Sequence, residues 1–165
     1  MVAFTVAQGW PVPLCDMPPF AGDLAADVDM LLAAHHRTIT REHVPRVAAE
    51  AVTLARRFGV DPEAARTAAL LHDMGGIVPR AVMVGLCETL GICVEPEERQ
   101  VPMLLHAKLS VVLAQERYGV SDPAVLQAIR FHTTLHAEPS PLDLVVFLAD
   151  KLECCLLYTS PSPRD

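Results

Sequence analysis

Residues 61–76 read "DPEAARTAALLHDMGG", an apolar segment that opens with an Asp-Pro pair and closes with a histidine, an aspartate and two glycines. Asp before Pro is typical of a helix start, because aspartate caps free backbone N–H groups and proline is favoured at the first helical position. The glycines predict that the helix ends at the His-Asp pair. Two side chains that are costly to bury therefore end an apolar helix, so they either face solvent or bind something.

The rest of the chain repeats this helical pattern. Six further segments combine apolar residues at helical spacing with capping residues, prolines or terminal glycines. They lie at 23–36, 40–59, 79–91, 101–119, 121–132 and 140–152. No segment shows the alternation of a half-buried strand. The sequence therefore predicts an all-α fold with a single helical domain over residues 23–154.

The composition agrees with one folded domain. The chain has 165 residues, of which 52% are hydrophobic and 20% charged, and aromatic residues make up only 5%. A net charge of −7 without a basic stripe argues against a nucleic-acid polymer as partner. A small phosphorylated ligand stays compatible with this charge, because a local site can oppose it.

The N-terminal residues and the cysteines indicate where the protein resides. Residues 1–22 are rich in proline and glycine, and we expect an irregular arm that lacks the basic start of a secretory signal. No apolar run reaches the roughly 18–20 residues that span a membrane. The cysteines show no CxxC spacing and are expected to be reduced thiols; they are Cys15, Cys87, Cys93, Cys154 and Cys155. These features predict a soluble, cytoplasmic protein with no membrane partner.

Several polar residues interrupt apolar helical segments. They are His43, His72, His106, His132 and Asp150. Any one of them alone is more often a satisfied core residue than a ligand. Several on separate helices of one small domain favour a shared cavity that holds a metal ion. Imidazole and carboxylate groups suit iron, manganese or zinc, whereas the absence of CxxC and HExxH argues against a structural zinc site or a zinc protease.

Two spacings limit which residues can share an ion. Adjacent helical residues diverge by about 100°, so His72 and Asp73 can reach one ion only if the helix ends there. His132 and His136 stand four residues apart in "HTTLH". That stretch contains no glutamate and lies near an expected helix end, so we do not expect both histidines to be ligands.

The order of these motifs resembles the HD-domain metal-dependent phosphohydrolases. "HD" alone is weak, but "REHVPRVAAEAVTLARRFGVDPEAARTAALLHD", "LLHAKLS", "AIRFHTT" and "SPLDLVVFLADKLE" together are specific. They are similar to the YqeK-like branch, bacterial symmetrical diadenosine tetraphosphate hydrolases that use iron. The resemblance covers roughly residues 25–153 and implies a helical HD bundle.

The resemblance also implies roles for individual residues. The expected metal ligands are His43, His72, Asp73 and Asp150. Those expected to meet the phosphates of the substrate are His43, His106, His132 and Thr133. Asp73, His106 and His132 are the expected catalytic residues, because Asp73 is placed to orient a water and the histidines to stabilise phosphate oxygens.

Two positions depart from the family pattern. Relatives keep a phosphate-contacting lysine where this chain has Gly76, and Arg80 is a candidate substitute. Relatives continue "HTT" with glycine, whereas this chain has Leu135. Both changes leave the expected metal ligands in place and bear on the choice of substrate.

The C-terminal residues form a third departure. The family continues with more helical turns after "LADKLE", whereas this chain ends "CCLLYTSPSPRD", which resembles a translated sequencing-adapter remnant. We therefore expect residues 155–165 to be a non-native, disordered tail on a domain truncated at its C-terminus.

The predicted function is symmetrical hydrolysis of a dinucleoside tetraphosphate to two nucleoside diphosphates by an iron-dependent enzyme, with manganese or zinc as other candidate metals. Two alternatives remain: an HD-domain nucleotidase or phosphatase acting on another nucleotide or phosphoester, and a non-catalytic nucleotide-binding module. A homodimer is compatible with each of them.

Overall fold

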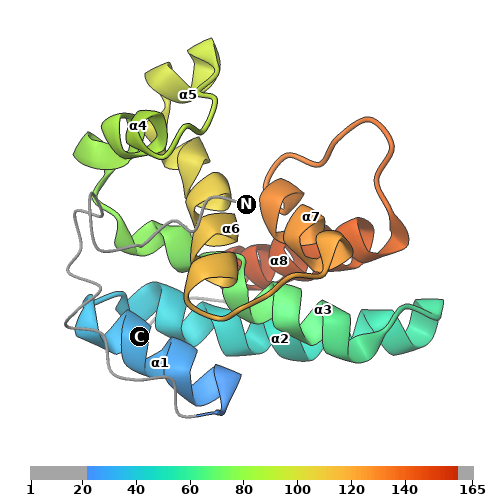
Figure 1. Ribbon diagram of the computed structural model, residues 1–165. Coiled ribbons are helices and arrows are strands. Elements are labelled where there is room, and N and C mark those ends of the chain that lie inside the picture. The colour runs from blue at the N-terminus through green and yellow to red at the C-terminus, as the bar shows by residue number, and fades with distance from the viewer. Residues whose placement is uncertain (1–21, 160–165) are drawn as a thin grey trace.

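The structure is a computed structural model that describes the backbone of residues 22–159 and the side chains of residues 22–154 (Figure 1). The described part contains eight α-helices, two 3₁₀ segments and no strand, which confirms the predicted all-α fold. The elements are α1 (Leu24–Ala34), α2 (Thr38–Phe58), α3 (Pro62–Leu71), η2 (Met74–Ile77), α4 (Arg80–Thr89), α5 (Pro96–Gln100), η3 (Pro102–Leu105), α6 (His106–Glu116), α7 (Pro123–Phe131) and α8 (Pro141–Thr159). Apart from residue 22, the expected N-terminal arm lies outside the described residues.

Helices α2 and α3 lie side by side across the lower part of the molecule (Figure 1). Their buried sides carry small residues, which allow helix backbones to approach closely: Ala48, Ala51 and Ala55 on α2, and Ala65, Ala68 and Ala69 on α3. Gly59 ends α2 in the left-handed conformation, with φ of 70°, as its position predicts. This pair forms the base on which the other helices converge.

The expected capping devices are present at the starts of α3 and α7. The Asp61 carboxylate accepts a hydrogen bond from the N–H of Glu63, and the Asp122 carboxylate accepts one from the N–H of Ala124. Each helix then begins with proline, whose missing N–H removes a donor that would otherwise need a partner. At the start of α8, the N–H of Asp143 donates to Ser140 Oγ at 3.2 Å. Local sequence thus sets the starts of α3, α7 and α8.

Three elements differ from the expectation. The segment expected as one helix at 101–119 divides into η3 and α6, and the carbonyl of Met103 in η3 accepts a hydrogen bond from the His106 ring. Helix α5 was not predicted, because a proline followed by four charged or polar residues shows no apolar period; a capping box between Glu95 and Glu98 stabilises it. Helix α8 continues to Thr159, since no proline or glycine interrupts it before residue 160.

The helical backbone of residues 155–159 differs from the disordered tail that we expected to begin at residue 155. Residues 160–165 lie outside the described part. The non-native origin of this sequence stays a prediction.

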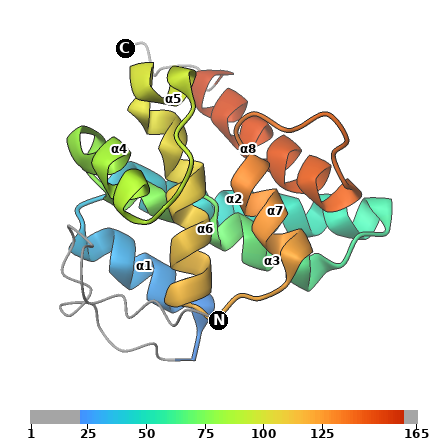
Figure 2. The ribbon, with the colours of Figure 1, turned by 45° about the horizontal axis from the view of Figure 1, so that its top comes forward.

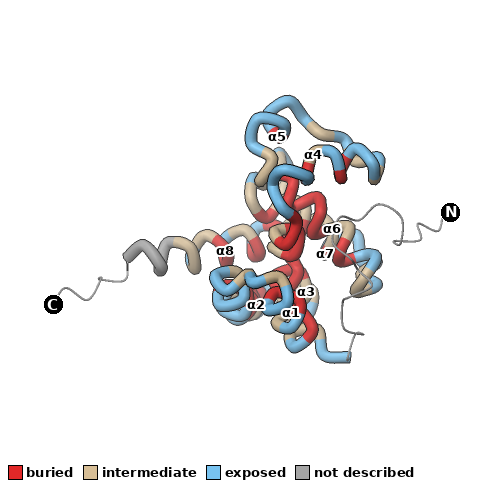
Figure 3. The backbone as a smooth tube through the Cα atoms, turned by 90° about the vertical axis from the view of Figure 1, so that its left-hand side faces the viewer, coloured by how far each residue is buried: buried red, intermediate tan, exposed pale blue. Residues whose placement is uncertain are grey.

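Buried residues concentrate where α3, α6 and α7 meet above α2 (Figure 3). Helices α4 and α5 stand to one side of this centre and expose most of their residues (Figures 2 and 3). Helix α8 packs against α2 and α7. Five helices therefore direct side chains into one buried region, while α4 and α5 form its outer edge.

Among the described residues, no single helix is long and apolar enough to cross a membrane. One pair of segments passes that test jointly, Pro62–Ile77 and Arg80–Thr89, but it is bent by 107°. The apolar side chains of the first segment are mostly buried in the core described above.

The turn after α7 contains a strained residue. Leu135 has φ of 57°, in the left-handed region, and its N–H donates to the Phe131 carbonyl at 2.8 Å. A residue with a Cβ costs roughly 1–2 kcal/mol in this conformation, whereas glycine adopts it freely. A glycine, which the family pattern implies at this position, would adopt this conformation without that cost.

We expect Leu135→Gly to be more stable than Leu135→Ala by about 1 kcal/mol in chemical denaturation, because the pair differs only by the Cβ in a left-handed conformation. The same comparison at exposed Ala137, where φ is not positive, serves as control, and there alanine is expected to be at least as stable as glycine. Equal stabilities of the two variants at position 135 would show that its backbone is unstrained.

Candidate metal centre

Polar side chains from five helices meet in the buried region. Each helix supplies them at a particular point: α2 near its start, α3 and α7 at their ends, α6 at its first residue and α8 near its middle. The residues are His43, His72, Asp73, His106, His132 and Asp150. All except Asp73 are buried, and the Asp73 side chain is 27% exposed. The structure thus brings together all six histidine and aspartate residues that the sequence marked for the site.

The His-Asp pair lies at a change of helix type. Helix α3 ends at Leu71, and the 3₁₀ segment η2 begins at Met74. This change lets two consecutive side chains approach each other, with His72 Nε2 and Asp73 Oδ2 separated by 3.5 Å. The helix end predicted from the two glycines is therefore what allows both residues to reach one point.

Three histidine rings are held in the same way. Nδ1 of His72, His106 and His132 lies 2.6, 2.6 and 2.8 Å from the backbone carbonyl three residues earlier. A carbonyl oxygen only accepts, so Nδ1 carries the proton and donates it. Nε2 of each neutral ring is then left with a lone pair that points into the site. This is the arrangement in which histidine binds metals.

Asp73 lies between two groups of histidines. Its Oδ2 faces His72, while its Oδ1 lies 3.2 Å from His106 Nε2 and 3.5 Å from His132 Nε2. The ligand atoms of His43, His72 and Asp73 all lie within 4.8 Å of one another, and so do those of Asp73, His106 and His132. One carboxylate therefore belongs to both groups.

Asp150 closes the first group from the side of α8. Its Oδ1 lies 3.1 Å from His43 Nε2 and 3.8 Å from His72 Nε2. Asp150 thus approaches the same two imidazoles that Asp73 accompanies, which makes two imidazoles and two carboxylates the donors of this group. This donor set matches that of borderline divalent ions such as iron, manganese and zinc.

Two features of the donors fit a cation. Nε2 of His72 is buried and has no hydrogen-bond partner, although such atoms are rarely left unpaired. Nε2 of His106 and Nε2 of His132 lie 3.0 Å apart, so two neutral rings would direct lone pairs at each other. A cation bound beside His72 would give its Nε2 a partner. A cation or a proton between His106 and His132 would separate their two lone pairs.

The comparisons with known proteins agree with this geometry. The family model described as "HD domain" matches residues 40–154. The chain belongs to the HD-domain family. Its HD residues are His72 and Asp73.

Two relatives of this HD domain are bacterial proteins named bis(5'-nucleosyl)-tetraphosphatase, symmetrical. The protein from Halalkalibacterium halodurans is 36% identical over 116 residues, which cover 68% of this chain and 59% of the relative. The protein from Bacillus subtilis is 33% identical over 118 residues, which cover 72% of this chain and 61% of the relative. The chain therefore spans about 60% of the length of these relatives.

A solved structure shares the fold. It is described as a predicted HD superfamily hydrolase involved in NAD metabolism from Clostridium acetobutylicum, and it aligns with a TM-score of 0.73 and 29% identity. The alignment covers 82% of this chain and 70% of the other. The sequence-based assignment to the HD domains is thus confirmed.

The charges of the HD site are those that metal binding requires. Burial lowers the pKa of His72 to about 4, so this ring is neutral at pH 7. Burial alone raises the pKa of a carboxyl, but the facing histidines hold the pKa of Asp73 well below its usual value. His43, His72 and Lys151 likewise keep the pKa of Asp150 low. A neutral imidazole and two ionised carboxylates are available without any proton having to be displaced.

His106 behaves differently from His72. Although burial lowers its pKa, the hydrogen bond and charge of Asp73 outweigh burial and raise the pKa above the usual histidine value. Of His72 and His106, it is therefore His106 whose protonated form Asp73 stabilises.

The low pKa of His72 predicts a pH dependence of stability in the metal-free protein. Between pH 7 and pH 5 the unfolded chain takes up a proton on His72 that the folded chain does not, so acidification favours unfolding. We expect wild type to lose about 2 kcal/mol of unfolding free energy relative to His72→Asn over this range. Denaturant titrations at both pH values in EDTA measure this difference. A constant difference would show that His72 titrates normally in the folded state.

The remaining predicted residues occupy different places. Thr133 Oγ1 lies 2.9 Å from His132 Nε2 and 3.5 Å from His106 Nε2, so it borders the second group. His136 instead faces Asp143, with Nε2 and Oδ2 3.0 Å apart. Arg80 is exposed at the first position of α4.

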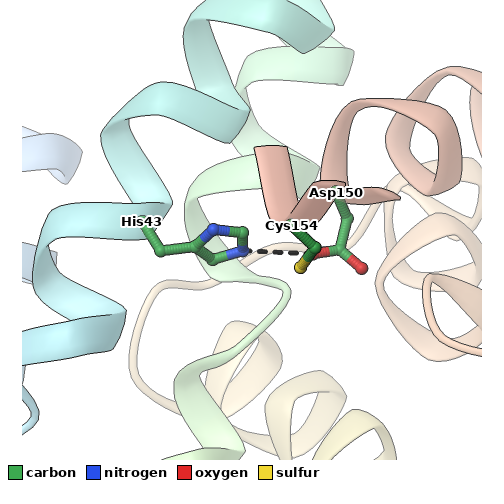
Figure 4. A group of neighbouring side chains, drawn as sticks. All are labelled: His43, Asp150 and Cys154. Atoms are coloured by element: carbon green, nitrogen blue, oxygen red, sulfur yellow. Dashed lines mark hydrogen bonds and ion pairs between the residues drawn. The ribbon is translucent and has the colours of Figure 1, made fainter. Parts of the chain in front are cut away.

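Two features of the site were not predicted. Lys151, the residue after Asp150 in the chain, donates to Asp150 Oδ2 at 2.8 Å. Cys154 lies beside the same carboxylate, with Sγ 3.6 Å from Oδ1 (Figure 4). The available signal was the spacing of four residues from Asp150 to Cys154, which places both on one face of a helix.

A hollow opens next to the second group of donors. Its lining includes Thr133, Thr134, Arg130 and the glutamates Glu95 and Glu98. Burial lowers the pKa of the Arg130 guanidinium, although this group stays charged at neutral pH. The hollow thus offers one cation and several hydrogen-bond acceptors beside the buried site.

Proposed function

We propose that this HD domain is a metal-dependent phosphohydrolase that cleaves a phosphoanhydride, and that its substrate is a dinucleoside tetraphosphate split into two nucleoside diphosphates. The observation that carries the proposal is the convergence of His72, His106 and His132 on the Asp73 carboxylate. The names of the two tetraphosphatase relatives support the substrate.

In this proposal His43, His72, Asp73 and Asp150 hold the metal ion. A bound divalent ion lowers the pKa of a coordinated water and offsets the negative charge that develops on the attacked phosphate. The burial of His43, His72 and Asp150 keeps bulk water from weakening these electrostatic interactions.

The other residues act on the phosphate and the water. Asp73, which faces both groups, holds the attacking water by accepting its hydrogen bond. His106 and His132 stabilise the non-bridging phosphate oxygens, and the raised pKa of His106 lets it donate a proton there. Thr133 offers a hydroxyl to the same oxygens. His43 lies next to the phosphate because it belongs to the group of residues that holds the ion.

We further propose iron as the resident metal, with manganese and zinc as the alternatives, and a cytoplasmic protein that acts alone or as a homodimer. The donor set of two imidazoles and two carboxylates supports iron, manganese and zinc over calcium or magnesium. Metal analysis after anaerobic purification identifies the ion and gives the number of ions per chain.

One observation favours a second candidate, an HD-domain nucleotidase that accepts another nucleotide or phosphoester. The position at which relatives keep a phosphate-contacting lysine is Gly76, and no atom lies within 4 Å of where its Cβ would be. A long polyphosphate loses one cationic contact there, whereas a single phosphate needs fewer contacts.

A substrate panel separates the two candidates. The metal-loaded protein is incubated with diadenosine tetraphosphate, diadenosine triphosphate and adenosine mono-, di- and triphosphate, and the products are resolved by ion-exchange chromatography. ADP as the sole product of the tetraphosphate supports the proposal. A mixture of AMP and ATP, or preferential turnover of mononucleotides, contradicts it.

We expect Gly76→Lys to lower KM for diadenosine tetraphosphate by about tenfold, because one charge-assisted hydrogen bond to phosphate contributes roughly 1.5–3 kcal/mol. The backbone at Gly76 is open to a side chain. Gly85→Lys, at an open and exposed position of α4, adds the same charge elsewhere and is the matched control. An equal effect of both variants on KM would mean that net charge alone is responsible.

A further inference from the structure

Cys154 forms a cluster with two of the proposed metal ligands. The ligand atoms of His43, Asp150 and Cys154 lie within 4.8 Å of one another. Figure 4 shows the sulfur beside the carboxylate oxygen that meets His43. Asp150 and Cys154 come from one face of α8, and His43 comes from α2, which packs against it.

The separations between these atoms suit a shared ion. Asp150 Oδ1 lies 3.1 Å from His43 Nε2 and 3.6 Å from Cys154 Sγ. Bonds from zinc to nitrogen, oxygen and sulfur are about 2.0–2.3 Å, so two ligands of one ion lie at most roughly 4.5 Å apart. The two separations measured from Asp150 fall below this limit.

A separate observation indicates that a ligand belongs at this place. His72 is fully buried, its Nε2 has no hydrogen-bond partner, and that atom lies 3.8 Å from the same Asp150 oxygen. The unpaired nitrogen of a fully buried ring thus lies next to the cluster. Cys154 is only half-buried, so an ion can be exchanged past it.

We infer that Cys154 is an additional, sulfur ligand of the metal centre, beside His43, His72 and Asp150. On binding, the thiol proton passes to solvent and the thiolate coordinates the ion. A soft thiolate favours zinc, iron or cobalt over manganese and magnesium. The inference rests on the metal centre of the proposed function and is independent of its substrate.

Cobalt(II) is the probe, because a thiolate bound to it gives a charge-transfer absorption in the near ultraviolet that oxygen and nitrogen ligands do not give. Reduced protein, freed of metal with a chelator, is titrated with cobalt(II) under anaerobic conditions. Wild type is expected to show this band in proportion to bound cobalt, and Cys154→Ser is expected to lose it while still binding cobalt.

Two variants serve as controls for the other thiols. Cys93→Ser removes an exposed thiol, and Cys155→Ser removes the neighbouring one; both are expected to keep the band. Circular dichroism and a thermal melt of each variant establish that the fold is retained. A band that persists in Cys154→Ser, that disappears in Cys155→Ser, or that is absent from cobalt-loaded wild type overturns the inference.

Metal competition gives a second readout. Cys154→Ser is expected to lose about tenfold in affinity for zinc relative to manganese, since only zinc gains much from a sulfur ligand. An unchanged ratio contradicts the inference. Neither measurement uses hydrolysis, so a protein that shows the band but cleaves no nucleotide refutes the proposed function alone.

Discussion

Asp73→Asn is expected to abolish metal retention and to reduce hydrolysis by about a thousandfold. Asp73 is the one residue shared by the two groups of donors, with His72 at one oxygen and His106 and His132 at the other. Asparagine keeps the size of the side chain but removes its negative charge. The loss of several kcal/mol of transition-state stabilisation corresponds to a thousandfold or more in rate.

The measurement combines metal analysis with the rate on diadenosine tetraphosphate. Asp29→Asn is the matched control, because it removes an equal charge from an exposed ion pair between Asp29 on α1 and Arg41 on α2. It is expected to retain both metal and activity. Full metal content and unchanged turnover in Asp73→Asn would sink the assignment of the metal centre, whereas bound metal with lost turnover would limit Asp73 to the chemical step.

A further consequence concerns the folded state of this variant. The pKa of Asp73 is held low by three histidines, so the carboxylate stabilises the fold above the pH at which it is protonated when unfolded. Metal-free Asp73→Asn is therefore expected to be less stable than metal-free wild type at pH 7. A comparison of the two proteins in EDTA separates this structural effect from the loss of metal.

The sequence predicted the helices whose signals are local. The Asp-Pro starts of α3 and α7 and the terminal Gly59 depend only on neighbouring residues, and the structure places them as expected. Helix α5 and the split between η3 and α6 were missed. The five residues of α5 have no apolar face, and the split is associated with a hydrogen bond from the His106 ring to the Met103 carbonyl.

The set of histidines and aspartates that meet in the buried region was predictable, but its geometry was not. Buried histidines on separate helices and the resemblance to HD domains identified the set. Spacing alone could not show that three rings are held by the carbonyl three residues earlier, since this depends on side-chain torsions. It also could not place Cys154 beside Asp150, because that contact requires α8 to continue past residue 152, where the helix was expected to end.

The two glycines after the His-Asp pair show the same limit. Both were interpreted as a helix stop, and Gly76 as the position of a lost lysine. In the structure they differ: a Cβ on Gly76 meets no atom, whereas a Cβ on Gly75 would lie 2.1 Å from the His106 carbonyl oxygen and 2.8 Å from the Ser110 nitrogen. Gly75 also donates its N–H to Ser110 Oγ at 2.8 Å. Gly75 is therefore needed for η2 to pack directly against α6.

Gly75→Ala is accordingly expected to destabilise the protein by about 4 kcal/mol, lowering Tm by roughly 10 °C, because the clash involves backbone atoms that cannot rotate away. Gly76→Ala, one residue further, is the matched control and is expected to change stability by less than about 0.5 kcal/mol. Thermal and denaturant unfolding of both variants measure the difference.

The same clash affects the metal centre. One backbone segment that must move carries His106 at the start of α6, and the other contains Gly75, two residues after Asp73. Where Gly75→Ala still folds, for example at low temperature, we expect weaker metal binding and a lower rate than in Gly76→Ala. If both variants match wild type in stability and metal content, η2 and α6 are not in the close contact described here. Loss of stability with full metal affinity would instead show that the six donors come together independently of this packing. The pair of glycine variants therefore tests whether the metal site depends on the contact between η2 and α6.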